Sequence, residues 1–229
     1  MLAEFPHPQV TVVICTLNEE GNLCHVLPKI PAWVDEVLLV DGHSRDKTVD
    51  MARKIRPDIR VLYQPEIGKG DALRCGFEHA SGDIVVTLDA DGATDPEEMP
   101  KFTKPLLEGY EFAKGSRFSI RLPAKKPAHR MFGNLLIAAL FNILYFSRFT
   151  DVCSGYNAFW KKALNGIDLG GDCFEDEPLL VAKVKKARLS IAEVGHCDLG
   201  RMYGEGNSPS WRQGFKAIKS IVRERLHNL

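Results

Sequence analysis

Two aspartates separated by one residue, Asp89 and Asp91, follow an uninterrupted apolar run. Side chains two positions apart in an extended strand point to the same side, so both carboxylates could approach one hard cation. Mg²⁺ in proteins is commonly held by one or two carboxylates together with substrate phosphates. The plain alternative is a turn in which an aspartate caps the next helix. The apolar run before the pair favours metal binding.

Other polar or glycine-rich segments also follow apolar runs. Asp41 follows the second run, where a carboxylate could accept hydrogen bonds from a nucleobase or ribose, or simply form an Asp-Gly turn. Gly68 and Gly70 flank Lys69 and could let a phosphate approach backbone N–H groups. Position 73 is a leucine, so the G-x-G-x-x-G fingerprint is not met, and no G-x-x-x-x-G-K-[ST] motif occurs. These departures argue against NAD enzymes and P-loop NTPases.

The elements that must position these residues alternate along the first 115 residues. Short β-rich runs predict strands over residues 10–15, 36–40, 60–63 and 83–88. Helical patterns lie between them, over residues 20–29, 46–56, 69–80 and 95–108. Such alternation predicts an α/β fold with a mostly parallel sheet and helices on both faces. Ligands bind such sheets outside the carboxyl ends of the strands, so the polar segments should converge there.

Length and composition indicate one globular domain. The chain has 229 residues, 45% hydrophobic and 26% charged, with zero formal net charge. The charge is unevenly distributed, because residues 1–111 contain 11 basic and 20 acidic residues, whereas residues 112–229 contain 19 and 10. The halves could simply attract each other, or an acidic half could hold a cation while a basic half faces phosphate or a membrane. A neutral chain is a poor candidate for general nucleic-acid binding.

The cysteines and the N-terminal residues indicate a reducing compartment. None of the six cysteines forms a C-x-x-C pair, so zinc-binding spacing is absent. The first residues lack the basic and apolar regions of a secretory signal. We therefore expect reduced thiols and a cytoplasmic protein, with peripheral contact at the cytoplasmic membrane face as an extension.

The second half contains two segments that could meet a membrane. Residues 131–147 are 17 uncharged residues between Arg130 and Arg148, which fits a buried core helix or an in-plane helix better than a membrane span. A last helix ending near Leu226 is amphipathic and carries a basic stripe, which is either solvated or attracted to anionic lipid. A segment ending at Gly115-Ser116-Arg117 and residues 190–194 predict strands, and residues 177–188 predict a helix.

The order of the motifs resembles family-2 glycosyltransferases, close to the dolichyl- or polyprenyl-phosphate mannosyl- and glucosyltransferases. The matching segments are TLNEE, VDGHSRDKT, GKGDALRCGF, ASGDIVVTLDADG, GSRF, TDVCSGYNAFWKKAL and FEDEPLLVAKVKKARLSIAEV. The resemblance covers about residues 8–226 and implies a GT-A fold, a nucleotide-sugar donor and Mg²⁺ or Mn²⁺. It also implies a donor half over residues 1–115 and an acceptor half over residues 116–229.

The resemblance implies roles for individual residues. Donor contacts are expected from Leu17, Glu19, Asp41, Lys69, Asp89 and Ala90, and metal ligation from Asp89 and Asp91. Arg117, Arg130 and Arg201 are expected near the acceptor phosphate, and Asp91, Arg117 and Asp176 in catalysis. The family's usual proline and tyrosine are replaced by Cys15 and Leu17, and a usual acidic residue by Gly42. The choice between UDP, GDP and dTDP therefore stays open.

Three functions follow from this resemblance. The first is inverting hexose transfer to a polyprenyl phosphate, which needs no general base because the acceptor is already anionic. The second is transfer to a soluble hydroxyl acceptor, which needs a base to take the proton, with Asp176 in the acidic cluster 175–177 as candidate. That cluster could instead simply face a helix dipole. The third is a non-catalytic nucleotide-sugar-binding module.

Overall fold

The computed structural model describes residues 7–119, 128–167, 177–204 and 211–226, with side chains for all of these except 128 and 211–213. The strands are β1 Val10–Thr16, β2 Glu36–Asp41, β3 Arg60–Tyr63, β4 Ile84–Asp89, β5 Phe112–Ser116, β6 Asn157–Trp160 and β7 Ile191–Gly195. The α-helices are α1 Leu23–Val26, α2 Thr48–Ile55, α3 Lys69–His79, α4 Met99–Leu107, α5 Ala128–Tyr145, α6 Glu177–Lys186 and α7 Trp211–Leu226. The 3₁₀ turns are η1 Leu27–Lys29, η2 Pro96–Glu98 and η3 Lys161–Leu164.

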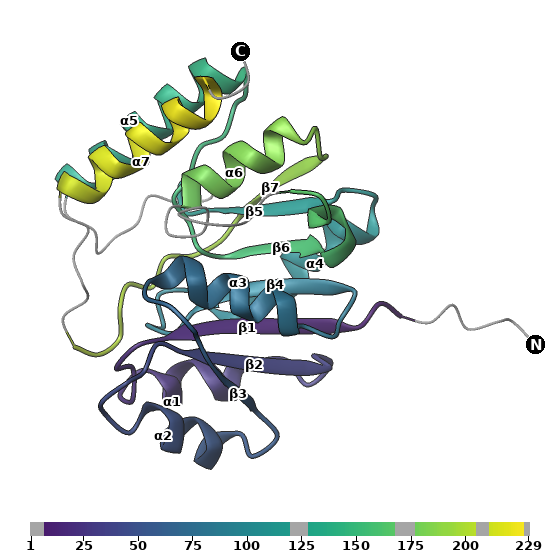
Figure 1. The fold of residues 1–229 in the computed structure, drawn as a ribbon. Coiled ribbons are helices and arrows are strands. Elements are labelled where there is room, and N and C mark those ends of the chain that lie inside the picture. Colours follow the sequence, from purple (N-terminus) through teal and green to yellow (C-terminus); the bar gives the residue numbers. More distant parts are fainter. Residues whose placement is uncertain (1–6, 120–127, 168–176, 205–210, 227–229) are drawn as a thin grey trace, which may run out of the picture.

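The strands form one sheet in the order β3-β2-β1-β4-β6-β5-β7 (Figure 1). Every pairing is parallel except those of β6, which runs antiparallel to both β4 and β5. The expected strands are confirmed to within a residue or two. The sequence reasoning did not predict β6, a four-residue strand within a stretch that matches a family motif, and the helix expected over residues 20–29 is a single α-helical turn followed by η1.

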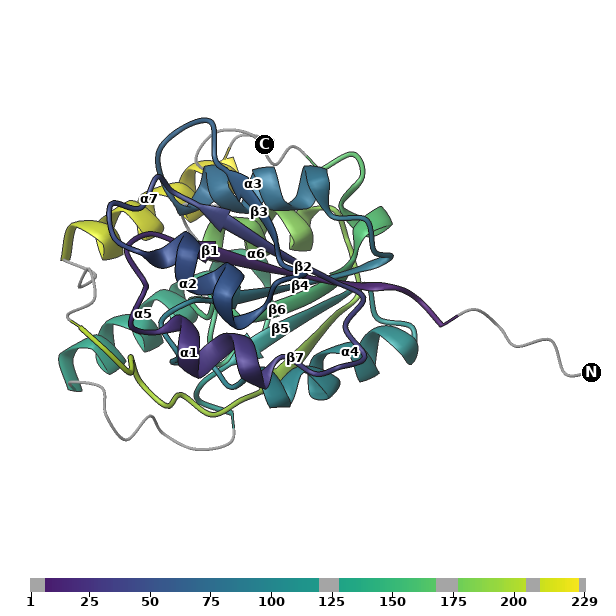
Figure 2. The same ribbon diagram turned by 90° about the horizontal axis from the view of Figure 1, so that it is seen from below.

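Alternating side chains of the strands bury two apolar cores, one on each face of the sheet. Val12 and Ile14 pack with α1, α2 and α4, whereas Val13, between them, packs with α3 and α6. This period-2 division follows from the pleat of a strand. Figure 2 shows the helices on both sides of the sheet, as the sequence predicted.

A third core joins α5, α6 and α7. The inner faces of α5 and α7 meet through Phe141, Tyr145 and Ile221, and the Tyr145 hydroxyl donates to the Ile221 carbonyl at 2.8 Å. The two helices lie side by side near the β7 edge of the sheet, at the end where the parallel strands finish (Figure 1). In the described part of the chain, no helix combines the length and apolarity that crossing a bilayer requires.

Candidate functional site

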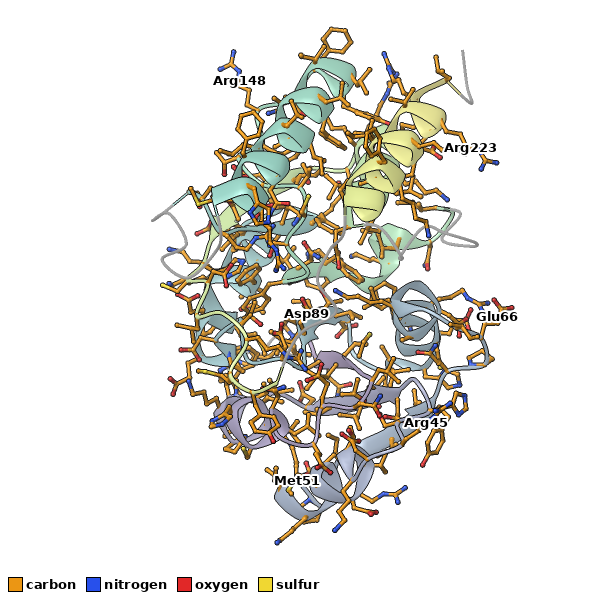
Figure 3. All side chains as sticks on the ribbon, turned by 90° about the vertical axis from the view of Figure 1, so that its left-hand side faces the viewer. Arg45, Met51, Glu66, Asp89, Arg148 and Arg223 are labelled. Atoms are coloured by element: carbon orange, nitrogen blue, oxygen red, sulfur yellow. The ribbon has the colours of Figure 1, made fainter. Side chains whose placement is uncertain are left out.

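The carboxyl ends of β1, β2 and β4 meet at one edge of the sheet. Their register places Cys15 beside Asp89 and Thr16 beside Asp41. Figure 3 looks onto this edge and shows Asp89 in the middle of it, between the α5–α7 pair and the loops that follow β1 and β2. The expected convergence of the polar segments is therefore observed.

Asp89 is the last residue of β4 and forms an ion pair with Lys69. The Lys69 Nζ lies 2.6 Å from Asp89 Oδ1 and 2.7 Å from Glu177 Oε1. Although burial opposes the charged form, the two carboxylates raise the pKa of Lys69 well above its ordinary value. The neighbouring Cys15 thiol is partly buried, and burial is the main cause that raises its pKa to about 12, so it is protonated at neutral pH.

Asp91 lies in the turn after β4 rather than on the strand, which differs from the expected alternation along an extended run. Its Oδ1 accepts a hydrogen bond from the Ala93 N–H at 2.9 Å, and Gly92 adopts the left-handed region with φ of +76°. Ala90, between the two aspartates, is buried. Burial and then the charge of Asp89 raise the pKa of Asp91, because two nearby carboxylates repel each other's ionisation.

Asp41 is buried and holds the loop after β2 together. It accepts hydrogen bonds from the Ser44 N–H at 2.8 Å, the Ser44 hydroxyl at 2.6 Å and the Thr16 hydroxyl at 3.2 Å. The Ser44 hydroxyl in turn accepts from the Asn18 N–H at 2.8 Å, which joins this loop to the loop after β1. Leu17, in the β1 loop, is exposed at the same edge.

Residues 196–204, the strap, cross from β7 to the loop after β1. The Arg201 guanidinium donates two hydrogen bonds to Glu19, at 2.9 and 2.7 Å. Backbone N–H groups of Leu199 and Met202 donate to the carbonyls of Ala93 and Asp91, at 2.9 and 3.0 Å. The strap therefore fixes the turn that carries Asp91 and brings Arg201 to it.

The remaining predicted residues lie in the second half. Arg117 follows β5, and its Nε and Nη2 lie 2.6 and 2.9 Å from the carboxylate of Asp151, which is fully buried. Burial alone would raise the pKa of Asp151, but the hydrogen bonds and charge of Arg117 hold it far below its ordinary value. Arg130 is in the first turn of α5. Asp176 lies outside the described residues.

Two residues that the sequence reasoning missed lie against this site. A Cβ added at Gly155 would stand 2.6 Å from Asp89 Oδ2 and 2.8 Å from Lys69 Nζ, so no larger residue fits without movement. Lys114 is fully buried on β5 and donates to the Ser154 carbonyl at 2.7 Å. Burial lowers the pKa of Lys114. The sequence could have indicated Lys114, because a lysine inside a short apolar strand is unusual. Nothing in the local sequence distinguished Gly155.

The carboxylates fit a divalent cation that is completed by a ligand. Within the described ranges, no group of three or more His, Cys, Asp or Glu residues could hold a metal by itself. Asp89 and Asp91 supply hard oxygen donors, and the Lys69 ammonium already neutralises Asp89. One or two carboxylates plus substrate phosphates is the arrangement that Mg²⁺ usually takes.

The outer faces of α5 and α7 are apolar and exposed. On α5 and just after it, Phe132, Ile143 and Phe146 are 70, 72 and 84% exposed. On α7, the exposed stripe contains Phe215 and Leu226. The basic residues at or near these faces include Arg148, Lys219 and Arg223. Figure 3 labels Arg148, which follows α5, and Arg223, which is on α7. Large exposed apolar faces rimmed by charge are typical of interaction surfaces.

A family model and known relatives match this chain over most of its length. The model of the family described as "Glycosyl transferase family 2" matches residues 11–167. Glycosyltransferase AglJ of Haloferax volcanii is 30% identical over 82% of this chain, which spans only 63% of that relative's length. A dolichyl-phosphate hexose transferase of the same organism is 30% identical, with 97% of this chain and 96% of the relative aligned.

Solved structures support the fold. Glucosyl-3-phosphoglycerate synthase of Mycobacterium tuberculosis, crystallised with Mn²⁺, UDP and phosphoglyceric acid, superposes with a TM-score of 0.75. The match covers 96% of this chain and 79% of the other at 22% identity. The GT-A fold that the motifs implied is thereby confirmed.

Proposed function

Since this chain belongs to glycosyl transferase family 2, we propose that it transfers a hexose from a nucleotide sugar to a polyprenyl phosphate. The observation that carries the proposal is the position of Asp89 at the same edge of the molecule as the exposed apolar faces of α5 and α7 (Figure 3). A lipid-linked acceptor could thus place its phosphate near Asp89 while its hydrocarbon chain contacts the apolar faces of α5 and α7. The name of the dolichyl-phosphate hexose transferase relative supports the same acceptor class.

The donor is assigned to the half formed by residues 1–115 and the acceptor to residues 116–229. In the donor half, Leu17 and Glu19 lie on the loop after β1, and Asp41 is the last residue of β2, at the edge where nucleosides bind in such sheets. Asp89 and Asp91 would hold Mg²⁺ or Mn²⁺, with Ala90 between them and Lys69 beside them. Such an ion neutralises charge on the leaving diphosphate.

The reaction is a single displacement. An anionic oxygen of the acceptor phosphate supplies the electron pair for the new bond to the anomeric carbon. The bond from that carbon to the donor's diphosphate oxygen breaks, and its electron pair stays on the departing nucleoside diphosphate. No proton moves, so no general base is needed, and the configuration inverts. Arg117, Arg130 and Arg201 are the cations proposed to orient the acceptor phosphate and balance its charge.

We place the protein peripherally at the cytoplasmic membrane face. The outward stripes of α5 and α7 provide the apolar contact, and Arg148, Lys219 and Arg223 provide attraction to anionic lipid. Each basic residue near such a surface contributes about 1 kcal/mol. The five described cysteines are free thiols, in keeping with a reducing compartment.

Label transfer tests the proposal directly. The protein is incubated with labelled UDP-, GDP- or dTDP-hexoses and Mg²⁺ or Mn²⁺, together with polyprenyl phosphate or with soluble hydroxyl acceptors. Label is counted in the organic and the aqueous products. We expect EDTA-sensitive label in the organic phase with one of the donors. Label only on soluble hydroxyl acceptors would refute the lipid acceptor. It would instead favour transfer to a hydroxyl group, with Asp176 as the candidate general base. Nucleotide binding without turnover would refute the enzyme.

A further inference from the structure

The Lys69 ammonium joins carboxylates from the two halves of the molecule. Lys69 is the first residue of α3, and Glu177 is the first residue of α6. The Lys69 Nζ lies between Glu177 and Asp89, the last residue of β4, and is 2.6 Å from Asp89 Oδ1. Lys69 therefore neutralises the carboxylate that the proposed function assigns to the metal.

Asp89 lies in a narrow space between Gly155 and Lys69. A Cβ built at Gly155 would lie 2.6 Å from Oδ2, 3.1 Å from Oδ1 and 2.8 Å from the Lys69 Nζ. The Oδ1 side carries the Lys69 ammonium. The side chains of Lys69 and Asp89 remain 37 and 35% exposed, so the pair is open to a ligand. A cation that binds the Asp89 carboxylate would therefore lie close to the ammonium, and like charges at such distances repel.

We propose that Lys69 is a positioning residue that occupies Asp89 when no donor is bound and yields it when a metal-bound diphosphate arrives. The flexible four-carbon stem lets the ammonium leave Oδ1, while Glu177, 2.7 Å away, keeps it at the site. There it becomes a counter-charge for the diphosphate. The enzyme consequently binds the metal weakly alone and firmly together with diphosphate. This inference rests on the proposed role of Asp89 as a metal ligand.

Binding of Mn²⁺ alone, followed by the electron paramagnetic resonance signal of the free ion, tests the competition without catalysis. We expect Lys69→Gln and Lys69→Met to bind Mn²⁺ about tenfold more tightly than the wild type, because the competing cation is gone. Lys69→Arg, which keeps the charge, should stay near the wild type. Added pyrophosphate should improve Mn²⁺ binding more in the wild type than in either neutral variant.

Two controls separate this competition from a general change in charge. Lys29→Gln removes one positive charge from a lysine that pairs with Asp95 at 3.6 Å, and should change Mn²⁺ affinity less than twofold. In the Asp89→Asn background, Lys69→Gln should give no gain. Unchanged or weaker Mn²⁺ binding by both neutral Lys69 variants, or an equal gain in Lys29→Gln, would overturn the inference. Failure of the proposed function shows separately, as a wild type that moves no label into the organic phase.

Discussion

Arg201 donates two hydrogen bonds to the carboxylate of Glu19, although the two residues are 182 positions apart in the chain. The pair closes the strap over the turn that carries Asp91, and the strap's backbone adds a hydrogen bond from Met202 to the Asp91 carbonyl. One ion pair thus joins the loop after β1, the proposed metal turn and the chain after β7. It links the proposed donor loop directly to a proposed acceptor-phosphate residue.

Glu19→Gln should lower kcat/KM for transfer roughly 10- to 100-fold, because a hydrogen bond to a charged group contributes about 1.5–3 kcal/mol. Arg201→Met should have an effect at least as large, since it also removes a proposed phosphate contact. The double variant should lose less than the sum of the two single losses, because either single change already breaks the shared ion pair. Rates of label transfer for the four proteins complete the cycle, and additive losses would contradict the coupling.

Asp91→Asn should abolish measurable transfer, since the amide removes one of the two carboxylates proposed for the cation. EDTA should do the same to the wild type, and added Mn²⁺ or Mg²⁺ should restore it. The matched control is Asp95→Asn, because Asp95 caps η2 by accepting from the Glu97 N–H and asparagine caps equally well. Retained transfer in Asp91→Asn would remove the metal assignment, whereas a loss in both variants would point to misfolding of the turn.

Gly155→Ala should reduce transfer at least tenfold with little change in stability, because the new methyl must displace the ends of the Asp89 and Lys69 side chains. Gly133→Ala is the control: nothing lies within 4 Å of a Cβ at this helical position. There, alanine should stabilise by up to about 1 kcal/mol. Urea unfolding and initial rates measure both effects. Wild-type kinetics in Gly155→Ala would show that the contact does not constrain Asp89.

The Arg117–Asp151 pair predicts an acid-dependent stability. Because the folded-state pKa of Asp151 is depressed, its stabilising contribution is complete above its unfolded pKa of about 4. The contribution falls as the pH drops below 4 towards the folded-state value, since the unfolded chain then binds the proton first. The free energy of unfolding from urea titrations should therefore decline over this range. Asp151→Asn should flatten that part of the profile, and an unchanged slope would contradict the assignment.

Arg117→Met should destabilise the protein by about 3–5 kcal/mol at neutral pH, because it leaves the buried Asp151 carboxylate without its charged partner. Arg117→Lys should recover part of this loss, since lysine keeps the charge but not the bidentate geometry. Urea unfolding at pH 7 measures both variants. A loss below about 1 kcal/mol in Arg117→Met would show that the pair is not structural.

Replacing Phe132, Ile143 and Phe146 together with serine should weaken binding to anionic liposomes at least tenfold, because the outward apolar face of the α5 segment is lost. Lys219→Glu with Arg223→Glu should reduce binding most at low salt. Leu107→Ser is the control, since Leu107 is 62% exposed and is the last residue of α4. Helix α4 lies away from the α5–α7 pair (Figure 1). Flotation measures binding to the liposomes. Equal losses of binding in the control and in the triple variant would contradict the proposed membrane contact.

The local pattern of the chain was enough to predict the parallel half of the sheet. β1, β2 and β4 are continuous buried runs, and hydrophobic period and turn residues are properties of neighbouring positions. Because parallel strands end at one edge, the convergence of Asp41 and Asp89 followed from those runs alone. The motif order added the family and the fold.

Only the tertiary structure decided which residues surround the carboxylates. The antiparallel β6 pairs Asn157 with Thr87, and this register sets Gly155 against Asp89. Lys69 and Glu177 form an ion pair beside Asp89 although 108 positions separate them. Arg117 likewise forms an ion pair with Asp151, which is distant in the chain. Such contacts depend on how distant segments pack, since the energy of an ion pair depends on distance and burial in space. Residue type and spacing therefore identified the chemistry of the site. The tertiary packing determined which side chains contact its charged groups.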